Sequence, residues 1–148
     1  MLHYFRKQNL PIFHVQHISS QDGTFFLPDS NGANIHKEIA PLKNEKVVIK
    51  HFPNSFHETT LLHQLKEAEI EELVVCGMMT HMCIDTTVRA SKDYGYKIVL
   101  IADACATKDL EWNGITLPAN MVQSVYMASL NKVFAEVITS SDFFHTNN

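Results

Sequence analysis

The hydrophobic pattern alternates between short apolar runs and longer segments with helical spacing. The apolar runs are rich in β-branched residues and lack polar alternation, as expected for strands buried on both faces of a parallel sheet. These runs are Pro11–Ile18, Val47–Lys50, Leu73–Met79, Lys97–Asp103 and Val133–Thr139. Helical periodicity predicts helices at Glu58–Ile70, Ile84–Tyr94 and Ala119–Asn131, and Leu2–Leu10 is predicted to be the end of a helix stopped by Pro11.

Repeated β–α units predict an α/β protein, specifically a three-layer α/β/α sandwich with a mainly parallel sheet. No internal repeat or Gly/Ser linker divides the chain, so we expect one domain over residues 1–148. Two connections, Ser19–Lys46 and Ala104–Pro118, are unusually long. Long connections often form the walls of a site, and ligands of open α/β sheets bind beyond the carboxyl ends of the strands. We therefore expect a pocket at that edge.

Composition narrows the class of protein. The 148 residues include 12 Lys and Arg against 16 Asp and Glu, which gives a net charge of −4 with no basic cluster. A nucleic-acid partner or a membrane-binding surface is therefore not expected. No apolar run approaches the ~20 residues that cross a bilayer. The three cysteines lack CxxC spacing, which is typical of a reduced, cytoplasmic protein.

Cys83 gives the sharpest chemical signal in the chain. The strand Leu73–Met79 runs into a tight Gly-containing turn and then a helix, with Thr80 as the expected N-cap. Cys83 then lies in the first helical turn, where unpaired N–H groups and the helix dipole favour a thiolate and can bind an oxyanion. The alternative is a small core thiol, which is what we expect of Cys76 and Cys105.

Other polar residues carry weaker signals. Lys50 ends a strand at the same sheet edge, where it stabilises negative charge or is a solvated cation. Phe56 lines a pocket or packs in the core. The nine histidines match no zinc signature, although His17 could meet His36 from the long loop. No Gly-rich phosphate loop or GxSxG elbow is present. We expect neither a metal nor a cofactor.

The stretch Val75–Ala106, which contains GMMTHMCIDTTVRASKDYGYKIVLIADACA, resembles the isochorismatase-like cysteine hydrolase family. That family includes nicotinamidases and N-carbamoylsarcosine amidohydrolases. The resemblance continues through Pro11–His17, Glu45–Leu61 and Asp103–Thr107, so it covers nearly the whole chain. The G-x-x-T-x-x-C turn and the K-x-x-x-S-x-F segment are its most specific parts.

The resemblance implies a Cys–Lys–Asp triad with Cys83 as nucleophile and Lys50 as catalytic lysine. It also implies a cis peptide between Met78 and Met79, with the N–H groups of Met79 and Cys83 facing the oxyanion. A cysteine at this place favours the amidase-type branch, in which attack on a small amide or carbamoyl compound cleaves a C–N bond through a thioester.

The same resemblance suggests the surroundings of the site. Phe56, Phe25, Trp112 and Thr80 are the expected residues of the substrate pocket. The substrate is expected to be a small molecule, and family members commonly form homo-oligomers, either dimers or tetramers.

The chain departs from the family at its start. Family members open with a strand of the form hydrophobic-D-x-Q-x-D, whose first Asp completes the triad, whereas this sequence begins inside the following helix. We therefore expect the N-terminal strand to be absent and its neighbours to expose apolar edges. A truncated chain, an edge covered by another subunit and a degraded paralogue all explain this.

The missing aspartate leaves the general base open. Asp22, Asp29 or Asp103 might replace it, and Asp103 is the best placed because it ends the strand beside the cysteine. No Asp-x-His pair follows the first strand, which argues against bound zinc and against nicotinamide as substrate. The main alternative to an active hydrolase is a catalytically impaired member that acts through binding or oligomerisation.

Overall fold

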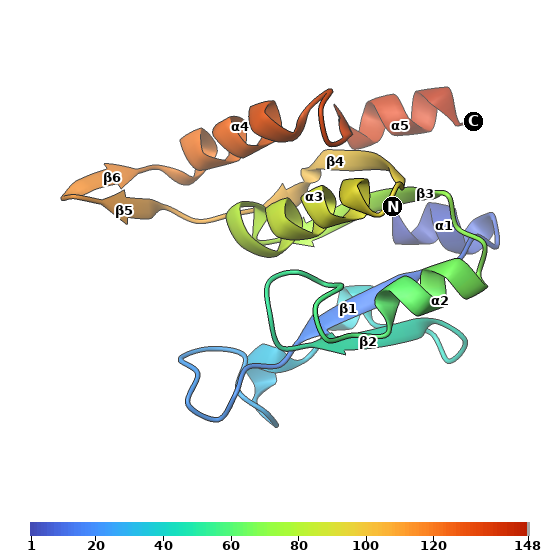
Figure 1. Cartoon of the computed structure of the whole chain (residues 1–148), viewed down its shortest axis with the longest axis horizontal. Coiled ribbons are helices and arrows are strands. Elements are labelled where there is room, and N and C mark those ends of the chain that lie inside the picture. The colour runs from blue at the N-terminus through green and yellow to red at the C-terminus, as the bar shows by residue number, and fades with distance from the viewer. Residues whose placement is uncertain (148) are drawn as a thin grey trace. The chain divides into compact units, whose positions relative to one another are not determined.

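The computed structural model describes residues 1–147 and divides the chain into two compact units. The first unit is Met1–Glu69, and the second begins at Ile70. The parallel α/β class expected from the apolar runs is confirmed in both (Figure 1). The five parallel strands do not form one hydrogen-bonded sheet in the described residues, because two belong to the first unit and three to the second.

The first unit is built on two parallel strands. Helix α1 (Leu2–Lys7) precedes strand β1 (Phe13–His17), and strand β2 (Lys46–Lys50) precedes helix α2 (Leu61–Glu67). The register runs from Phe13 opposite Lys46 to His17 opposite Lys50. The buried core side chains of this unit include Val48, Phe56, Leu61 and Leu65.

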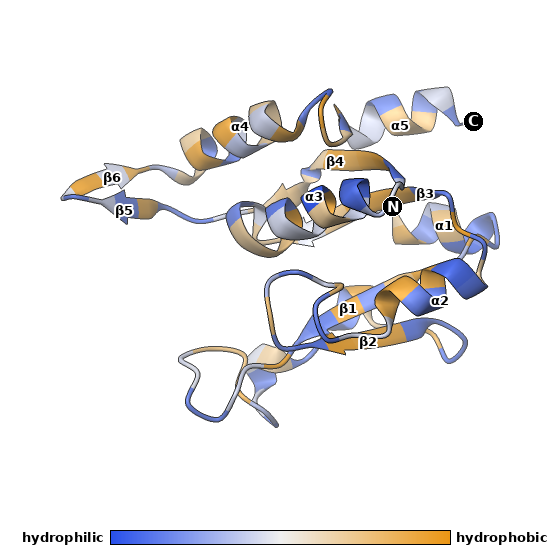
Figure 2. Cartoon of the chain, viewed as in Figure 1, coloured by the Kyte–Doolittle hydropathy of each residue, from blue (hydrophilic) through white to orange (hydrophobic). Residues whose placement is uncertain are grey.

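The second unit contains a three-stranded parallel sheet in the order β3 (Glu72–Met78), β4 (Lys97–Ala106), β7 (Glu136–Ile138). Helices α3 (Asp85–Asp93), α4 (Ala119–Leu130) and α5 (Ser140–Thr146) complete it. Leu100 and Ile101 on the central strand are fully buried, together with Val88 of α3 and Leu130 of α4. Apolar residues concentrate along the strands (Figure 2). This packing fixes the carboxyl ends of β3 and β4, where the chemistry-bearing residues lie.

The expected strand Val133–Thr139 is wrong at its start, because β7 begins only at Glu136. Residues before it form a turn in which Lys132 has a positive φ of 69° and Val133 is 64% exposed. The expected helix Glu58–Ile70 is likewise shorter, since α2 spans Leu61–Glu67. Apolar content alone does not distinguish a strand from a turn that packs one or two apolar side chains.

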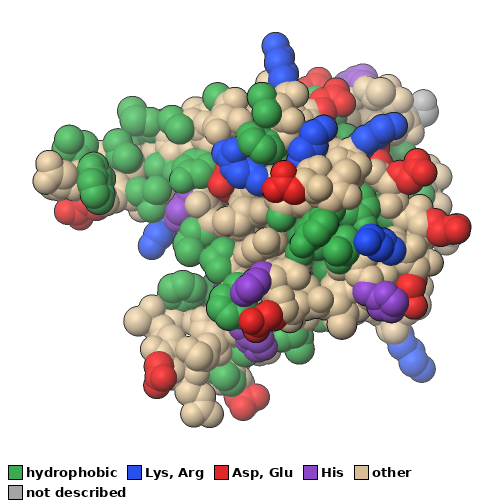
Figure 3. Space-filling model, in the orientation of Figure 1, with side chains coloured by type: hydrophobic (Ala, Val, Ile, Leu, Met, Phe, Trp, Pro, Cys, Tyr) green, Lys and Arg blue, Asp and Glu red, His purple; other side chains and the backbone are tan. Residues whose placement is uncertain are grey.

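The long connection Ala104–Pro118 is not structureless. Its strands β5 (Leu110–Trp112) and β6 (Ile115–Leu117) form an antiparallel hairpin around Asn113-Gly114, where both residues have positive φ. Asn-Gly is the preferred dipeptide of such two-residue turns. Trp112 is 78% exposed at the hairpin. Figure 1 shows the hairpin at the left of the view, and Figure 3 shows hydrophobic side chains gathered there.

Cys76 does not lie in the core, as its apolar strand suggested, but is exposed. Strand β3 is an edge of its three-stranded sheet, so one side of the strand has no neighbour within the unit. Met78 on the same strand is 60% exposed for the same reason. In the described part of the chain, no helix is both long and apolar enough to cross a membrane.

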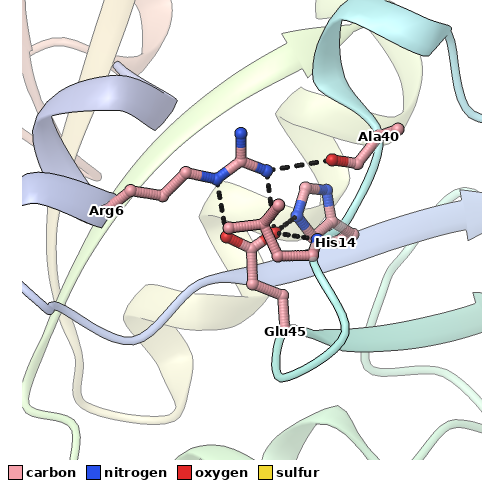
Figure 4. A network of polar contacts seen from close by, with 5 residues as sticks. Arg6, His14, Ala40 and Glu45 are labelled. Carbon is pink, nitrogen blue, oxygen red and sulfur yellow. Dashed lines mark hydrogen bonds and ion pairs between the residues drawn. The ribbon is translucent and has the colours of Figure 1, made fainter.

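An ionic network around Glu45 ties α1 to β1 and to the turn before β2 (Figure 4). Arg6 donates Nε to Glu45 Oε1 at 2.7 Å and a second N–H to Oε2 at 2.9 Å. His14 Nε2 lies 2.8 Å from Oε2, and the Leu42 N–H donates to the same oxygen. Hydrogen bonds from Arg6, then from Leu42 and His14, lower the pKa of Glu45 to about 2.

The lowered pKa of Glu45 makes folding of the chain depend on pH. A carboxyl group with a folded pKa below its unfolded value of 4.5 adds stability at neutral pH, and this stability is lost as pH falls from about 4.5 towards 2. We predict that Glu45→Gln lowers the urea midpoint at pH 7 and flattens its decline across that window. Urea titrations at several pH values measure both effects.

The control is Glu38→Gln, which removes an exposed carboxylate of the same unit. Asp103 and Asp142, whose pKa values are also lowered, stay unchanged in every variant and cancel in the comparison. A Glu45→Gln curve parallel to that of the parent chain over the acid range would show that this network does not couple folding to protons.

Candidate functional site

The turn after β3 is the most specialised backbone of the second unit. Gly77 has a φ of 137°, which L side chains rarely adopt, and the Met78–Met79 peptide bond is cis. Residues Thr80–Ile84 then form a π-helical turn before α3 begins at Asp85. The N–H groups of Met82 and Ile84 both donate to the Met79 carbonyl, at 3.0 and 3.3 Å. A glycine at position 77 is therefore explained by the positive φ that the backbone adopts there.

Thr80 is not the N-cap of the following helix, because it is the first residue of the π-helical turn and its side chain caps nothing. Its hydroxyl is fully buried and turns towards the sheet and α4. Oγ1 lies 2.7 Å from Gln123 Oε1 and 3.2 Å from the Ala106 carbonyl. Thr80 therefore anchors the turn, and with no exposed surface it is not placed to contact a substrate freely.

Cys83 lies within this turn, two residues before the start of α3. Its side chain is partly exposed, whereas π-turn residues Thr80 and Ile84 on either side of it are buried. A thiol held in a backbone turn and open to solvent is placed for reaction with a small molecule, in contrast to an inert core thiol. Cys105 has the same intermediate exposure, so what sets Cys83 apart is its place in the π-helical turn.

His81 is held next to the same turn. Its Nδ1 lies 2.6 Å from Thr107 Oγ1, and its ring makes an edge contact with Tyr126 of α4. Burial, with the positive charge of Lys108 added, lowers the pKa of His81 below its usual value. The imidazole is therefore neutral at pH 7 and engaged with Thr107.

Lys50 ends β2 in the first unit and is only 3% exposed. Its ammonium donates to the Phe52 carbonyl at 3.0 Å and to the Pro53 carbonyl at 2.6 Å. Two of its three N–H donors are thus fixed by the chain that follows it. Lys50 is not the solvated strand-end cation of the alternative interpretation, because a buried ammonium needs such partners.

The expected pocket residues are divided between the two units. Phe56 is buried in the first unit, where its N–H donates to Asn54 Oδ1, so the packing interpretation holds for most of its ring. Phe25, also in the first unit, is 51% exposed and contacts Phe26 edge to face. Trp112 belongs to the hairpin of the second unit. Within each unit, Lys50 lies close to the Phe52–Phe56 segment, and Cys83 lies close to Thr80.

His17 is a residue of interest that the sequence suggested only as a partner for His36. The register places it directly opposite Lys50 at the carboxyl ends of β1 and β2. Burial lowers the pKa of His17, and the neighbouring charges of Lys50 and His51 lower it further. Its Nδ1 is buried without a hydrogen-bond partner among residues 1–147. Only the strand register, which the sequence does not reveal, links His17 to Lys50.

The sequence suggested Asp103 as a replacement general base, but in the structure its carboxylate binds Ser140. Its two carboxylate oxygens accept from the Ser140 N–H at 2.7 Å and from the Ser140 hydroxyl at 2.6 Å. These hydrogen bonds lower its pKa. The carboxylate therefore holds the start of α5, and its lowered pKa makes it a weaker base.

A hollow of the second unit lies away from Cys83. It has a volume of about 330 Å³ and is lined by the first residues of the three strands, Glu72, Lys97 and Glu136, together with the turn around Phe134. It therefore marks the amino ends of the strands, whereas Cys83 follows a carboxyl end. Among residues 1–147, no three His, Cys, Asp or Glu side chains gather in a metal-binding group.

The second unit is a parallel α/β unit with a partly exposed cysteine in the turn after a strand, at the edge of the sheet where such folds place their sites. Comparisons with known proteins give the family. An isochorismatase domain matches residues 1–142. The isochorismatase family protein YddQ of Bacillus subtilis (strain 168) is 46% identical over 97% of this chain and 80% of its own length.

Solved structures agree with this match. An isochorismatase from Pseudomonas putida KT2440 superposes with a TM-score of 0.91 and 37% identity, covering 95% of this chain and 72% of that chain. Nicotinamidase 3 of Arabidopsis thaliana is 24% identical over 86% of this chain and 71% of its own length. This chain belongs to the isochorismatase family of hydrolases.

The environments of the three thiols predict their order of reactivity. Burial raises the pKa of Cys105 to about 11, so its thiolate is scarce at neutral pH. Cys83 is partly exposed in the turn. We predict that iodoacetamide at pH 7.5 alkylates Cys83 at least about ten times faster than Cys105, because the thiolate is the reacting species.

Peptide mass spectrometry over a time course measures the three rates within one sample. Cys76 serves as a second comparison thiol outside the turn, exposed on β3 although desolvation by the surrounding protein raises the pKa of its thiol. Equal rates at Cys83 and Cys76 would show that the turn gives its thiol no special reactivity.

Proposed function

We propose that the protein is a cysteine hydrolase that cleaves a C–N bond in a small amide or carbamoyl compound. The observation that carries the proposal is Cys83, a partly exposed thiol in the turn that closes β3, in a chain of the isochorismatase family. Nicotinamidase 3, a relative over most of this chain, is named for the hydrolysis of an amide.

The reaction divides into two halves. The Cys83 thiolate attacks the carbonyl carbon, the C–N bond breaks, and the amine leaves with a proton while a thioester remains. Water then attacks the thioester, releases the acid and restores the thiol. The backbone N–H groups of Met79 and Cys83 are the proposed donors to the oxyanion in both halves.

Lys50 is the proposed cation of the site. Its ammonium is fixed by the Phe52 and Pro53 carbonyls, so its position does not depend on a flexible side chain. The third N–H then remains for a negatively charged group. His17 lies opposite Lys50 in the register, and burial and the Lys50 charge lower the pKa of its imidazole, so we propose it as the proton acceptor of the first unit.

The proposal also covers the substrate, the cellular location and the assembly of the protein. The substrate is a small molecule, and Phe25 and Phe56 of the first unit and Trp112 of the second are each proposed to contact it. The protein works in the cytoplasm as a homo-oligomer. The exposed apolar side chains of the β5–β6 hairpin, Trp112 and Ile115, support self-association.

Turnover of a panel of primary amides, N-carbamoyl compounds and lactams tests this function directly. We predict ammonia or amine release that Cys83→Ser lowers by at least about 1,000-fold, because the residual activity of a site without its nucleophile is small. Lys50→Met is expected to lower kcat by about 100-fold or more through loss of charge stabilisation.

The matched control for Lys50 is Lys46→Met on the same strand, since Lys46 lies over the Phe13 ring at the opposite end of β2. Its kcat is expected to match that of the parent chain. Turnover that survives Cys83→Ser would contradict the mechanism, and a folded protein inactive across the whole panel would favour the binding or oligomerisation role.

A further inference from the structure

A half-buried side-chain amide of α4, that of Gln123, connects the turn carrying Cys83 to the sheet. Gln123 Nε2 donates to the Ala102 carbonyl at 3.1 Å and, more weakly, to the Cys105 carbonyl at 3.5 Å. Its Oε1 accepts from the Thr80 hydroxyl at 2.7 Å. One side chain therefore joins helix α4, strand β4 and the turn after β3.

The partners of Gln123 fix its orientation. The amide nitrogen faces two carbonyl oxygens, which accept hydrogen bonds only, so the amide oxygen is left to face Thr80. A flipped amide would set its oxygen against the carbonyls of Ala102 and Cys105 and lose both of those hydrogen bonds, although Thr80 could then accept from its nitrogen. The network thus has a single satisfied arrangement, which is what makes a buried polar cluster rigid.

Thr80 connects this hydrogen-bond network to the turn that contains Cys83. It has no exposed surface and opens the π-helical turn that contains Cys83 three residues later. Its hydroxyl proton has two acceptors, Gln123 Oε1 and the more distant Ala106 carbonyl. Without Gln123 the hydroxyl would turn to Ala106 alone, and the start of the turn would lose its tie to α4.

We propose that Gln123 is a positioning residue of the hydrolase: through Thr80 it sets the turn that presents the Cys83 thiol and the Met79 N–H. The inference rests on the proposed function for its catalytic consequence. It does not require Gln123 to touch the substrate. The positioning acts between residues 43 positions apart in the chain, inside one unit.

The first test replaces each end of the Gln123–Thr80 hydrogen bond. Gln123→Met keeps the length of the side chain without its polar atoms, and Thr80→Val keeps the shape without the hydroxyl. Each is expected to lower kcat by about 10- to 100-fold, the effect of small misplacement of a reacting group, while KM changes less than about threefold. Thr80→Ser retains the hydroxyl and is expected to restore kcat.

The double variant Gln123→Met with Thr80→Val tests whether the two side chains act through the same hydrogen bond. Because the two side chains act through one hydrogen bond, its kcat is expected to match that of the single variants. The matched control is Gln64→Met, which removes an equivalent bond from Gln64 Nε2 to Thr60 Oγ1 on α2 of the first unit. Its kcat and KM are expected to equal those of the parent chain.

A readout independent of turnover separates this inference from the proposed function. The alkylation rate of Cys83 by iodoacetamide, relative to Cys76, is expected to fall at least fivefold in both Gln123→Met and Thr80→Val, because the thiol loses its fixed place near the turn's N–H groups. A chain inactive on every amide but showing this loss would retain the positioning role and lose the hydrolase proposal.

The opposite result overturns the inference alone. Variants that melt at a lower temperature yet keep the parent kcat and Cys83 alkylation rate would make the network purely structural, while loss of turnover in Cys83→Ser would still uphold the hydrolase. If Gln123→Met fails to fold, the Thr80→Val and Thr80→Ser pair decides the question by the same two rates.

Discussion

The backbone turn that follows β3 is the constraint on which the candidate chemistry depends. Gly77 supplies a φ that other residues rarely adopt, and the Met79 carbonyl gathers two N–H donors within the turn. The sheet determines where this turn begins, because β3 pairs with β4 up to Met78. Cys83 is therefore placed by the backbone of the second unit, and its own side chain contributes only the sulfur.

The first unit buries two charged side chains, Lys50 and Glu45. Lys50 is almost fully buried, and its ammonium is satisfied by carbonyls of the segment that follows it. At the other end of the same strand pair, Glu45 receives hydrogen bonds from Arg6, Leu42 and His14. Hydrogen bonds within the unit stabilise both charged groups. The unit therefore holds a cation at the carboxyl ends of its strands without help from solvent.

Local patterns predicted the parallel strands well, and they placed Cys83 directly after β3, although in the first turn of the helix and not in the π-helical turn before it. Short β-branched runs mark buried strands, and the turn after Leu73–Met79 contains its signal within a few residues. The role of Thr80 was missed because its partner Gln123 lies on α4, and no local pattern reveals a bond across 43 residues. The opposition of His17 and Lys50 was missed for a similar reason, since strand register is a tertiary property.

Other differences arise from edges and turns. Cys76 has the sequence context of a core strand, but β3 is an edge of its sheet in this unit, so the thiol is exposed. The β5–β6 hairpin had a usable signal in Asn113-Gly114, flanked by Trp112 and Ile115. An Asn-Gly pair between two apolar residues predicts a hairpin more specifically than the length of the connection does.

The most direct measurement for the central claim is mass spectrometry of the protein quenched with acid during turnover of an amide substrate. The account predicts an acyl group, with the mass of the substrate less its amine, on the peptide that contains Cys83. Cys83→Ala should leave no adduct on any peptide. An active chain that never carries this adduct, or carries it on Cys76 or Cys105, would contradict the assignment of Cys83 as the nucleophile.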